Sequence, residues 1–342
     1  MNKNLLSILK YIFLLAIAFG LLFLAFKGVD VNKTIEEISH ANVFWLLASV
    51  FVSLVAFFSR AYRWNLLIEP LGYKPKFTST MYSLMVGYLA NLAVPRLGEV
   101  SRCGSLSKAE KIPFNSLLGT VIVERLIDVI SLLICLLLTA IIEYDRLGNF
   151  LMDTIFSPIR EKVNLYMQSA LFVTVVLVAL IVLISVIVWF IRKSRQAEGE
   201  SKLVTLIKGL VDGLLSIGQL KRPWVFLFQS VLIWVMYFFM AYLAFFALPM
   251  TSSLTWSAGM FILVVGGLGM SAPVQGGIGA YHLLVSQGLI LYGLTQEDGL
   301  AFATLLHTSQ LLLVIVLGGV SFLMLFLANK NRDNDIPGEI KK

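Results

Sequence analysis

The sequence predicts an all-α, polytopic transmembrane helix bundle, and three observations support this fold class. Of its 342 residues, 58% are hydrophobic and only 14% are charged, whereas an ordinary soluble domain carries about 25% charged residues. Apolar runs of about 20 residues, enough to cross a hydrocarbon core of about 30 Å, recur along the chain. The basic residues fall almost entirely in alternate connections between these runs. A water-soluble fold could not bury so much apolar surface.

The first spanning candidate is residues 5–26, with Lys3 before it and Lys10 near its start, in the manner of a secretory signal. This run is too long for a signal and is not followed by an Ala-x-Ala-like cleavage site, so we interpret it as a retained first helix. The other strong candidates are 43–59, 115–142, 167–191, 224–247 and 300–328.

Alternation of these six helices from a cytoplasmic N-terminus places 60–114, 192–223 and the C-terminal tail inside. Of the 27 Lys and Arg residues, 21 then lie inside, which accounts for most of the net charge of +7 without a nucleic-acid partner. The exceptions are Lys27, Lys33, Arg146, Arg160 and Lys162 outside, and Arg125 within a helix. We therefore expect a multi-pass protein of the cytoplasmic membrane with both termini in the cytoplasm.

Two weaker apolar stretches, 78–95 and 254–292, are interrupted by glycine and proline. Lys74 and Lys76 before 78–95 and the basic residues at 96–111 after it belong to the inside set, so both ends of 78–114 should lie in the cytoplasm. The flanks of 254–292 carry no Lys or Arg. We interpret each stretch as a re-entrant hairpin, one entering from either side of the membrane. The alternative, in which 78–95 and 254–271 are ordinary spanning helices, remains open.

The order helix, helix, hairpin, helix occurs twice, once in each half of the chain. The halves are about 5–142 and 167–328, and they cross the membrane in opposite senses. This pattern predicts an inverted repeat within a single transmembrane domain, 1–328, followed by a short cytoplasmic tail, 329–342. Transporters with such repeats bind their substrate where the two halves meet, beside broken helices.

The turn of each predicted hairpin contains a proline followed three residues later by glycine, Pro95 with Gly98 and Pro273 with Gly276. Proline removes a backbone donor and glycine permits an unusual turn, so the helix should break at both places. Backbone N–H groups exposed at such breaks can bind anions. The candidate substrate-binding residues in these turns are Arg96, Gly98, Glu99 and Arg102 in the first, and Pro273, Gly276, Gly277 and Gly279 in the second.

Three further candidates, Glu124, Arg125 and Asp128, stand about ten residues into the helix 115–142, or about 15 Å deep by helical rise. Glu124 and Asp128 share one face of the helix, and Arg125 can reach Asp128. Charged side chains at this depth cost about 2.5–3.5 kcal/mol each, so they usually pair and often mark a site.

Two interpretations of these charges remain open. In the structural one, Arg125 fixes the first hairpin through Glu99, while a carboxylate of the helix holds Arg96 or Arg102. In the functional one, the arginines bind a lipid phosphate through their planar forks and the carboxylates orient them.

The remaining polar residues carry weaker indications. His282 and His307 lie in predicted membrane segments and could relay protons, although a packing role is the simpler interpretation. Cys103 and Cys135 have neither disulfide nor zinc spacing. The sequence contains no phosphate-binding loop for ATP and no His-Glu-x-x-His motif. We therefore predict no catalytic residues, no metal site and no cofactor.

The motifs are Pro95-Arg96-Leu-Gly98-Glu99 with Arg102, Glu124-Arg125-Leu-Ile-Asp128, and Pro273-Val-Gln-Gly276-Gly277-Ile-Gly279. Together they resemble those of the lysylphosphatidylglycerol synthase transmembrane family, also described as flippase-like membrane proteins. The likeness covers roughly residues 5 to 328. The second hairpin departs from the proline-glycine-glycine form expected of the family, because Val274 and Gln275 separate Pro273 from Gly276.

The resemblance implies a membrane module that moves or presents polar lipids between leaflets. Full-length synthases add a soluble domain that transfers an aminoacyl group from tRNA, and we expect no such activity here. The leading hypothesis is a flippase or transporter for an anionic phospho- or glycolipid, whose partners are membrane lipids such as an anionic phospholipid or a polyprenyl-phosphate lipid. The alternative is a membrane enzyme or enzyme partner that presents such a lipid to a separate glycosyl- or aminoacyl-transferase, for example a membrane glycosyltransferase.

Overall fold

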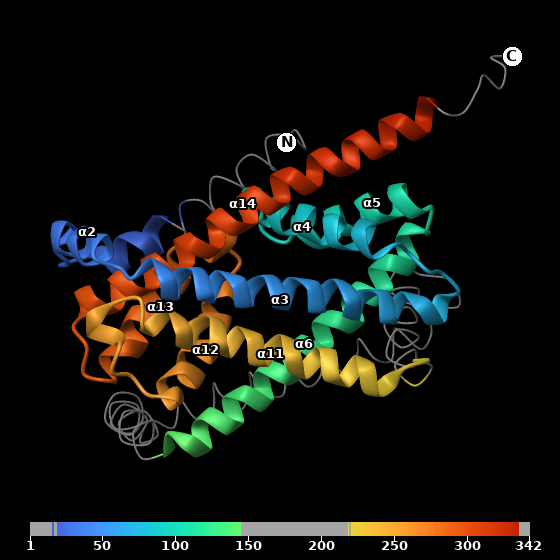
Figure 1. Cartoon of the computed structure of the whole chain (residues 1–342). Coiled ribbons are helices and arrows are strands. Elements are labelled where there is room, and N and C mark those ends of the chain that lie inside the picture. The colour runs from blue at the N-terminus through green and yellow to red at the C-terminus, as the bar shows by residue number, and fades with distance from the viewer. Residues whose placement is uncertain (1–15, 17–18, 145–217, 219, 335–342) are drawn as a thin grey trace, which may run out of the picture. The chain divides into compact units, whose positions relative to one another are not determined.

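The computed structural model describes residues 16, 19–144, 218 and 220–334 (Figure 1). By internal contacts the chain divides into two compact units, residues 1–139 with 215–342 and residues 140–214. Only the first few residues of the second unit belong to the described part of the chain. The fold and the site described below lie in the first unit.

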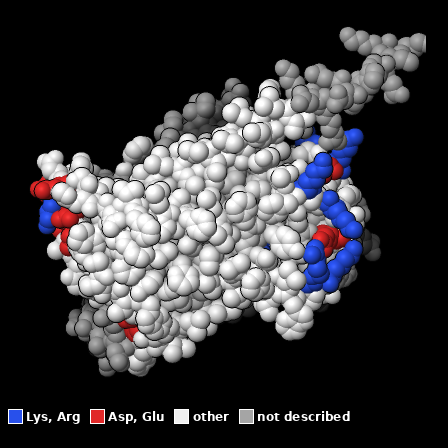
Figure 2. Space-filling model, viewed as in Figure 1, with Lys and Arg blue, Asp and Glu red and all other residues white. Residues whose placement is uncertain are grey.

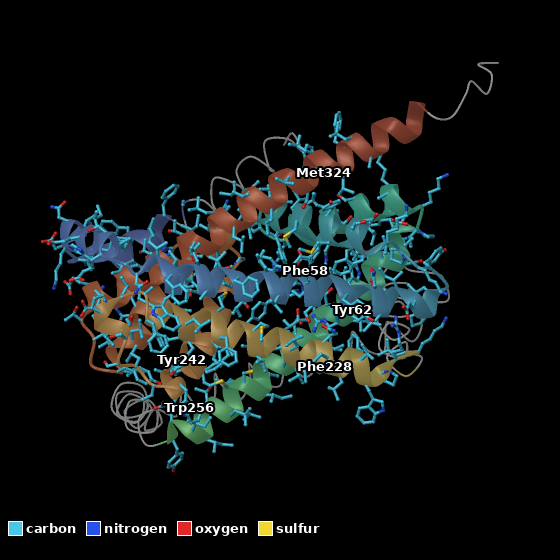
Figure 3. All side chains as sticks on the ribbon, in the orientation of Figure 1. Phe58, Tyr62, Phe228, Tyr242, Trp256 and Met324 are labelled. Atoms are coloured by element: carbon cyan, nitrogen blue, oxygen red, sulfur yellow. The ribbon has the colours of Figure 1, made fainter. Side chains whose placement is uncertain are left out.

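Four helices within the described residues are long and apolar enough to cross a bilayer. They are α3 (Val43–Ile68), α6 (Phe114–Ile142), α11 (Pro223–Phe245) and α14 (Gln296–Asn334). Many apolar side chains on these helices stay exposed, such as Phe58, Phe228 and Met324 (Figure 3). The prediction of an all-α, polytopic membrane bundle is confirmed.

Two predicted spanning segments cannot be compared with the structure in full. The segment 167–191 lies outside the described residues, as does most of 5–26, of which 19–26 are helical. One described helix, α2 (Val31–Ser39), was not predicted. It is too polar and short to register as a span, and it is capped by Asp30, whose carboxylate accepts the backbone N–H groups of Asn32 and Lys33.

Helix α3 is longer than predicted, because it continues past residue 59 to Ile68. Arg60 and Arg63 were assigned to a cytoplasmic connection, and this assignment was wrong. Both lie on the helix and are buried, with 6% and 0% of their surface exposed. Hydropathy ends the segment at the first arginine, whereas in the fold both guanidinium groups pair with carboxylates of α6, which lowers the cost of their burial.

Both broken stretches form helical hairpins. The first consists of α4 (Phe77–Ala93) and α5 (Leu97–Glu110), and the second of α12 (Trp256–Ser271) and α13 (Ala280–Ile290). In each hairpin the two arms pack against one another. By helical rise α4 is about 25 Å long and α13 about 16 Å, both shorter than a hydrocarbon core of about 30 Å. These lengths favour re-entrant hairpins over full spans.

The first turn depends on a close approach between its two arms. The backbone N–H of Gly98 donates to the side-chain oxygen of Asn91 at 2.6 Å. A Cβ atom on Gly98 would collide with the Gly87 carbonyl and the Asn91 side chain, so only glycine fits there. The spacing of Pro95 and Gly98 therefore predicted the break correctly.

The second turn contains a 3₁₀ segment, η5 (Gln275–Gly277), and is built from glycines in the left-handed region. Gly276, Gly277 and Gly279 have φ values of 56°, 76° and 82°. A Cβ atom on Gly276 would lie 2.9 Å from the Leu92 side chain at the end of α4. The turn of the second hairpin thus contacts the first hairpin close to the turn between α4 and α5.

The order long helix, hairpin, long helix occurs twice, as α3, α4–α5, α6 and as α11, α12–α13, α14. The corresponding helices α3 and α11 pack side by side and run antiparallel. The Ser49 hydroxyl donates to the Met240 carbonyl at 2.7 Å, and at the other end of the pair Arg222 binds Glu69. Opposite directions for equivalent helices are what an inverted repeat requires.

Basic side chains gather at one end of the described helices, and the broad face visible between the two ends is nearly free of charge (Figure 2). Helices α3 and α5 end here, and helices α4, α6 and α11 begin here. The segments there carry Lys74, Lys76, Lys108, Lys111, Lys221 and Arg222. Basic residues that the sequence assigns to one side of the membrane therefore lie together at one end of the helices in the fold.

Candidate functional site

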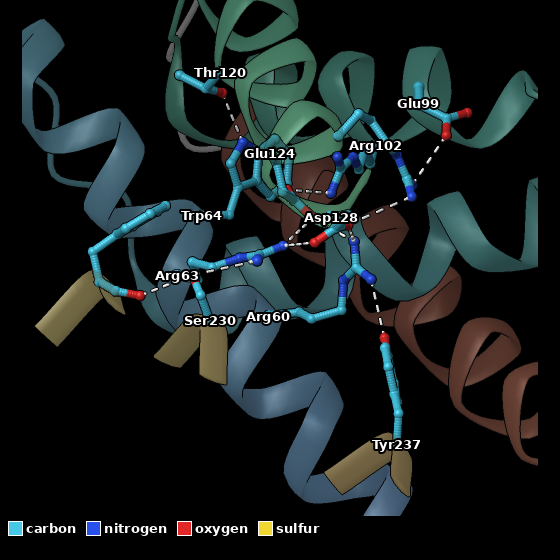
Figure 4. A network of polar contacts seen from close by, with 12 residues as sticks. Arg60, Arg63, Trp64, Glu99, Arg102, Thr120, Glu124, Asp128, Ser230 and Tyr237 are labelled. Carbon is cyan, nitrogen blue, oxygen red and sulfur yellow. Dashed lines mark hydrogen bonds and ion pairs between the residues drawn. The ribbon is translucent and has the colours of Figure 1, made fainter. Parts of the chain in front are cut away.

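A buried cluster of charged side chains joins α3, α5 and α6 (Figure 4). Its members are Arg60, Arg63, Glu99, Arg102, Glu124, Arg125 and Asp128. By helical rise, Glu124 lies about 15 Å from the start of α6 and Arg60 about 16 Å from Leu71 beyond the end of α3. Both distances run from the basic end and equal about half of a 30 Å hydrocarbon core.

Glu124 is the centre of the cluster and is fully buried. One carboxylate oxygen accepts from Arg60 Nη2 at 2.6 Å and lies 3.5 Å from Arg63 Nη2. The other oxygen accepts from Arg102 Nη1 at 3.0 Å. The Arg102 guanidinium also lies 4.7 Å from the Trp64 ring centre. A single carboxylate therefore holds three arginines from two helices.

Asp128 completes the connection between α3 and α6. Its two oxygens accept from Arg60 Nη2 at 2.8 Å and from Arg63 Nη2 at 2.6 Å. Each arginine also points its other terminal nitrogen at α11: Arg60 Nη1 donates to the Tyr237 hydroxyl at 3.0 Å, and Arg63 Nη1 lies 3.5 Å from the Ser230 hydroxyl. The second half of the chain thus contributes directly to the cluster.

Two contacts match the structural interpretation of the sequence motifs. Arg125 pairs with Glu99 at 3.0 Å, which ties α6 to the first hairpin, and Arg102 pairs with Glu124. Arg125 is the most exposed arginine of the cluster, with 42% of its side chain accessible. Arg96 lies in the turn itself, exposed, with a φ of 64°, and makes no ion pair with any described residue.

The cluster carries more positive charge than its carboxylates balance, because four arginines meet three acids. Five of its buried N–H sites have no partner among the described residues: Nε of Arg60, Arg63, Arg102 and Arg125, and Nη2 of Arg102. On Arg102 the Nε and Nη2 atoms form one edge of the planar guanidinium, the fork that binds two oxygens of a phosphate or carboxylate. The unpartnered fork is therefore of the kind that binds an additional anion.

Sequence reasoning missed Arg60, Arg63, Ser230 and Tyr237. A usable signal existed for the two arginines, since they share a helix face at i and i+3 and no proline or glycine lies between Val43 and Pro70. No signal marked Ser230 or Tyr237, whose roles depend on the packing of α11 against α3.

The predicted residues of the second hairpin, Pro273, Gly276, Gly277 and Gly279, lie in its turn. This turn meets the end of α4 through Gly276 and Leu92. None of the four contributes a hydrogen bond to the arginine cluster. Among the described residues no group of three metal-binding side chains occurs.

A family model described as the lysylphosphatidylglycerol synthase TM region matches residues 11–318 of the chain. A UPF0104 membrane protein from Methanocaldococcus jannaschii is 28% identical over 130 residues, which cover 37% of this chain and 36% of that protein. The chain thus matches only about a third of that relative's length. No solved structure gives a significant match. Because the family match includes both hairpins and the whole arginine cluster, the chain belongs to the lysylphosphatidylglycerol synthase TM region family.

Proposed function

We propose that this protein is a flippase-like lipid transporter that binds the phosphate of an anionic lipid in the arginine cluster and moves or presents that lipid across the cytoplasmic membrane. The observation that carries the proposal is the unpartnered fork of Arg102, which is buried at membrane depth beside an excess of positive charge. The lipid class is a phospholipid or a polyprenyl-phosphate lipid.

The charge balance favours a binding role over a purely structural one. A buried ionic network that serves packing alone is expected to be satisfied in charge and in hydrogen bonds, because each unpartnered buried donor costs about 1–3 kcal/mol. Here one positive charge and five N–H groups are left over, two of them the Arg102 fork, together with one acceptor, Glu99 Oε2. A singly charged phosphodiester would supply both the missing charge and the two acceptors that the fork lacks.

The other candidate residues have distinct roles in this proposal. Glu124 and Asp128 orient Arg60 and Arg63, and Glu99 holds Arg125 against the first hairpin. Arg96, exposed in the turn, makes the first contact with an arriving head group.

The glycines of both turns would let the lipid approach the backbone where the hairpins meet. These residues are Gly98 in the first turn and Gly276, Gly277 and Gly279 after Pro273 in the second. The basic end of the bundle faces the cytoplasm in this proposal, since the positive-inside rule places it there.

The first experiment is mass spectrometry of lipids retained by the detergent-purified protein. Arg102→Lys keeps the charge that pairs with Glu124 but removes the fork, and Arg222→Lys is a matched control at an exposed ion pair with Glu69. We expect one anionic lipid class to be enriched by the wild type and by the control, and to be lost from Arg102→Lys. Retention of bulk lipids alone, equal in all three proteins, would refute the proposal.

A translocation assay then separates movement from presentation. The enriched lipid, carrying a fluorescent label, is reconstituted in liposomes with the protein, and the label exposed on the outer leaflet is quenched over time. Movement across the bilayer supports a flippase. Binding without movement favours presentation of the lipid to a separate membrane glycosyl- or aminoacyl-transferase.

A further inference from the structure

A second group of buried polar side chains lies at the second hairpin, apart from the arginine cluster. His282 on α13 and His307 on α14 are 6% and 3% exposed, and their ring centres are 4.9 Å apart. The Tyr281 ring stacks on His307, also at 4.9 Å. Two histidines separated by more than twenty residues in sequence therefore form one pair, which we call the histidine pair.

The hydrogen bonding of the pair identifies which nitrogens are free. His307 Nε2 lies 2.8 Å from the Gly276 carbonyl oxygen. A carbonyl can only accept, so Nε2 carries the hydrogen, and in the neutral ring Nδ1 is left with a bare lone pair. The Nδ1 atoms of both His307 and His282 are buried and have no hydrogen-bond partner in the part of the chain that the structure describes. Each ring thus offers a nitrogen whose hydrogen bonding is unsatisfied.

The surroundings of the pair are polar but almost without charge. Unpartnered polar atoms continue along the same elements, on Gln275 of η5 and on Thr304 and Gln310 of α14, one turn to either side of His307. Tyr281 is the other titratable residue of α13. Helix α12, which packs against α13, has no titratable side chain.

Helices α4, α12 and α13 and the segment η5 carry no charged residue. The other helices that pack on α14 are α2, with Lys33, Glu36 and Glu37, α3, with Arg60 and Arg63, α5, with Glu99, Arg102, Lys108 and Glu110, and α11, whose titratable residues are tyrosines. Helix α4, which contacts η5, has only the tyrosines Tyr82 and Tyr88 as titratable residues. The acids at the start of α14, Glu297 and Asp298, are about 14 Å or more from His307 by helical rise. No described carboxylate or cation makes an ion pair or a hydrogen bond with either imidazole.

The carboxylates of the arginine cluster are poor proton carriers by comparison. Glu124 and Asp128 each accept from at least two arginines, and a proton arriving there would have to displace a buried ion pair. Imidazole, in contrast, exchanges protons near neutral pH. Its lone pairs at this site have no competing partner.

We propose that His282 and His307 form a binding site for one proton, and that protonation of the pair controls the second hairpin. The incoming proton bonds to an Nδ1 lone pair of one imidazole and gives a single imidazolium, while His307 Nε2–H continues to donate to Gly276. A second proton is excluded, because two cations this close would repel one another.

The proton site reaches the first hairpin through a short chain of contacts. His307 holds the Gly276 carbonyl, and Gly276 touches Leu92 at the end of α4. A change of charge on His307 therefore acts on the point where the two hairpin turns meet. Resting on the lipid transport proposed above, this coupling would let protons crossing the membrane drive the lipid step.

Proton binding can be tested without any lipid assay, by NMR of the protein with isotope-labelled histidine rings in nanodiscs. The chain has three histidines, and His40, exposed after α2, is the third. In a His40→Gln background only the pair is observed. We expect the two rings to take up one proton between them as the pH falls from 8 to 4. His282→Gln should lower the midpoint of His307 by about one pH unit, a tenfold loss of proton affinity.

Two results would overturn the proton site: rings that stay neutral throughout this range, or rings that each bind a proton independently of one another. A His307→Gln protein provides a second check, because the glutamine amide can still donate to Gly276. In liposomes with a pH gradient, fluorescent phosphatidylglycerol should move faster with the wild type and His40→Gln than without the gradient. His307→Gln should lose this acceleration, and its retention would refute the coupling.

The two proposals fail in different ways. If the wild type moves no lipid but the pair binds one proton, the transport proposal is wrong and the proton site stands. If lipid moves equally with and without the gradient while the pair titrates, the coupling is wrong. Arg102→Lys should abolish lipid movement and leave the titration of the pair unchanged.

Discussion

Replacing Glu124 with glutamine gives the sharpest test of the arginine cluster. Glutamine keeps the shape of the side chain but removes the charge that three arginines share, so the excess charge of the cluster rises from +1 to +2. Glu124 is fully buried, and breaking a buried ion pair by removing one partner costs about 3–5 kcal/mol. Glu69→Gln is the matched control, because the partner of Glu69, Arg222, is exposed and such pairs contribute about 0–1 kcal/mol.

The chain carries its own reporter for this measurement. Both cysteines, Cys103 and Cys135, are buried, so a thiol-reactive fluorophore labels them only as the protein unfolds. On heating in detergent, Glu124→Gln should unfold at a distinctly lower temperature than the wild type, and Glu69→Gln close to it. Equal midpoints for the two variants would show that Glu124 does not hold the cluster together.

A double variant tests whether the cost arises from charge. Arg102→Gln combined with Glu124→Gln returns the excess charge to +1 and removes both partners of one ion pair. The two substitutions should therefore cost less together than the sum of their separate costs, by about 1–3 kcal/mol. Additive costs would refute the electrostatic explanation and point to packing alone.

Three further substitutions have expected outcomes in the same unfolding assay. Gly98→Ala should destabilise the protein by about 1–3 kcal/mol, because the new Cβ has no room against α4. Gly104→Ala is the control: a Cβ there would meet nothing within 4 Å, so this substitution should be neutral or stabilising. Equal effects of the two substitutions would contradict the close approach of α5 to α4. Arg125→Gln should cost no more than about 1 kcal/mol, since its ion pair is partly exposed. Trp64→Phe should cost about 1 kcal/mol through loss of the 2.8 Å hydrogen bond to Thr120, and a wild-type midpoint would show that this bond does not contribute.

Much of the fold was predictable because a bilayer limits what the backbone can do. Every polar backbone group inside the membrane must be satisfied, so apolar runs become helices, and proline with glycine marks where they break. For this reason the spans of α6 and α11 and both hairpins were anticipated within a few residues. The end of α3 was not anticipated, because hydropathy scores each arginine alone. Such a score cannot include the carboxylate partner that lowers the free-energy cost of burying the arginine.

The site was predictable in composition but not in pairing. Glu99, Arg102, Glu124 and Arg125 were all singled out, and the structure brings them together. The pairing of arginines with carboxylates depends on how α3 and α5 are rotated about their axes. The sequence does not set this rotation, and a guanidinium can reach several carboxylates over the range of possible rotations. The histidine pair shows the same limit, since only the packing of α13 on α14 brings the two rings into contact.

The surplus positive charge at half-depth has an electrical consequence. A unit charge that crosses the full membrane potential gains or loses about 2.3 kcal/mol per 100 mV, and a charge held midway feels roughly half of that. A bound phosphodiester would cancel the surplus, so the occupied protein would be nearly indifferent to voltage while the empty one would not. Membrane potential would then bias the return of the empty protein and leave the lipid-loaded step almost untouched.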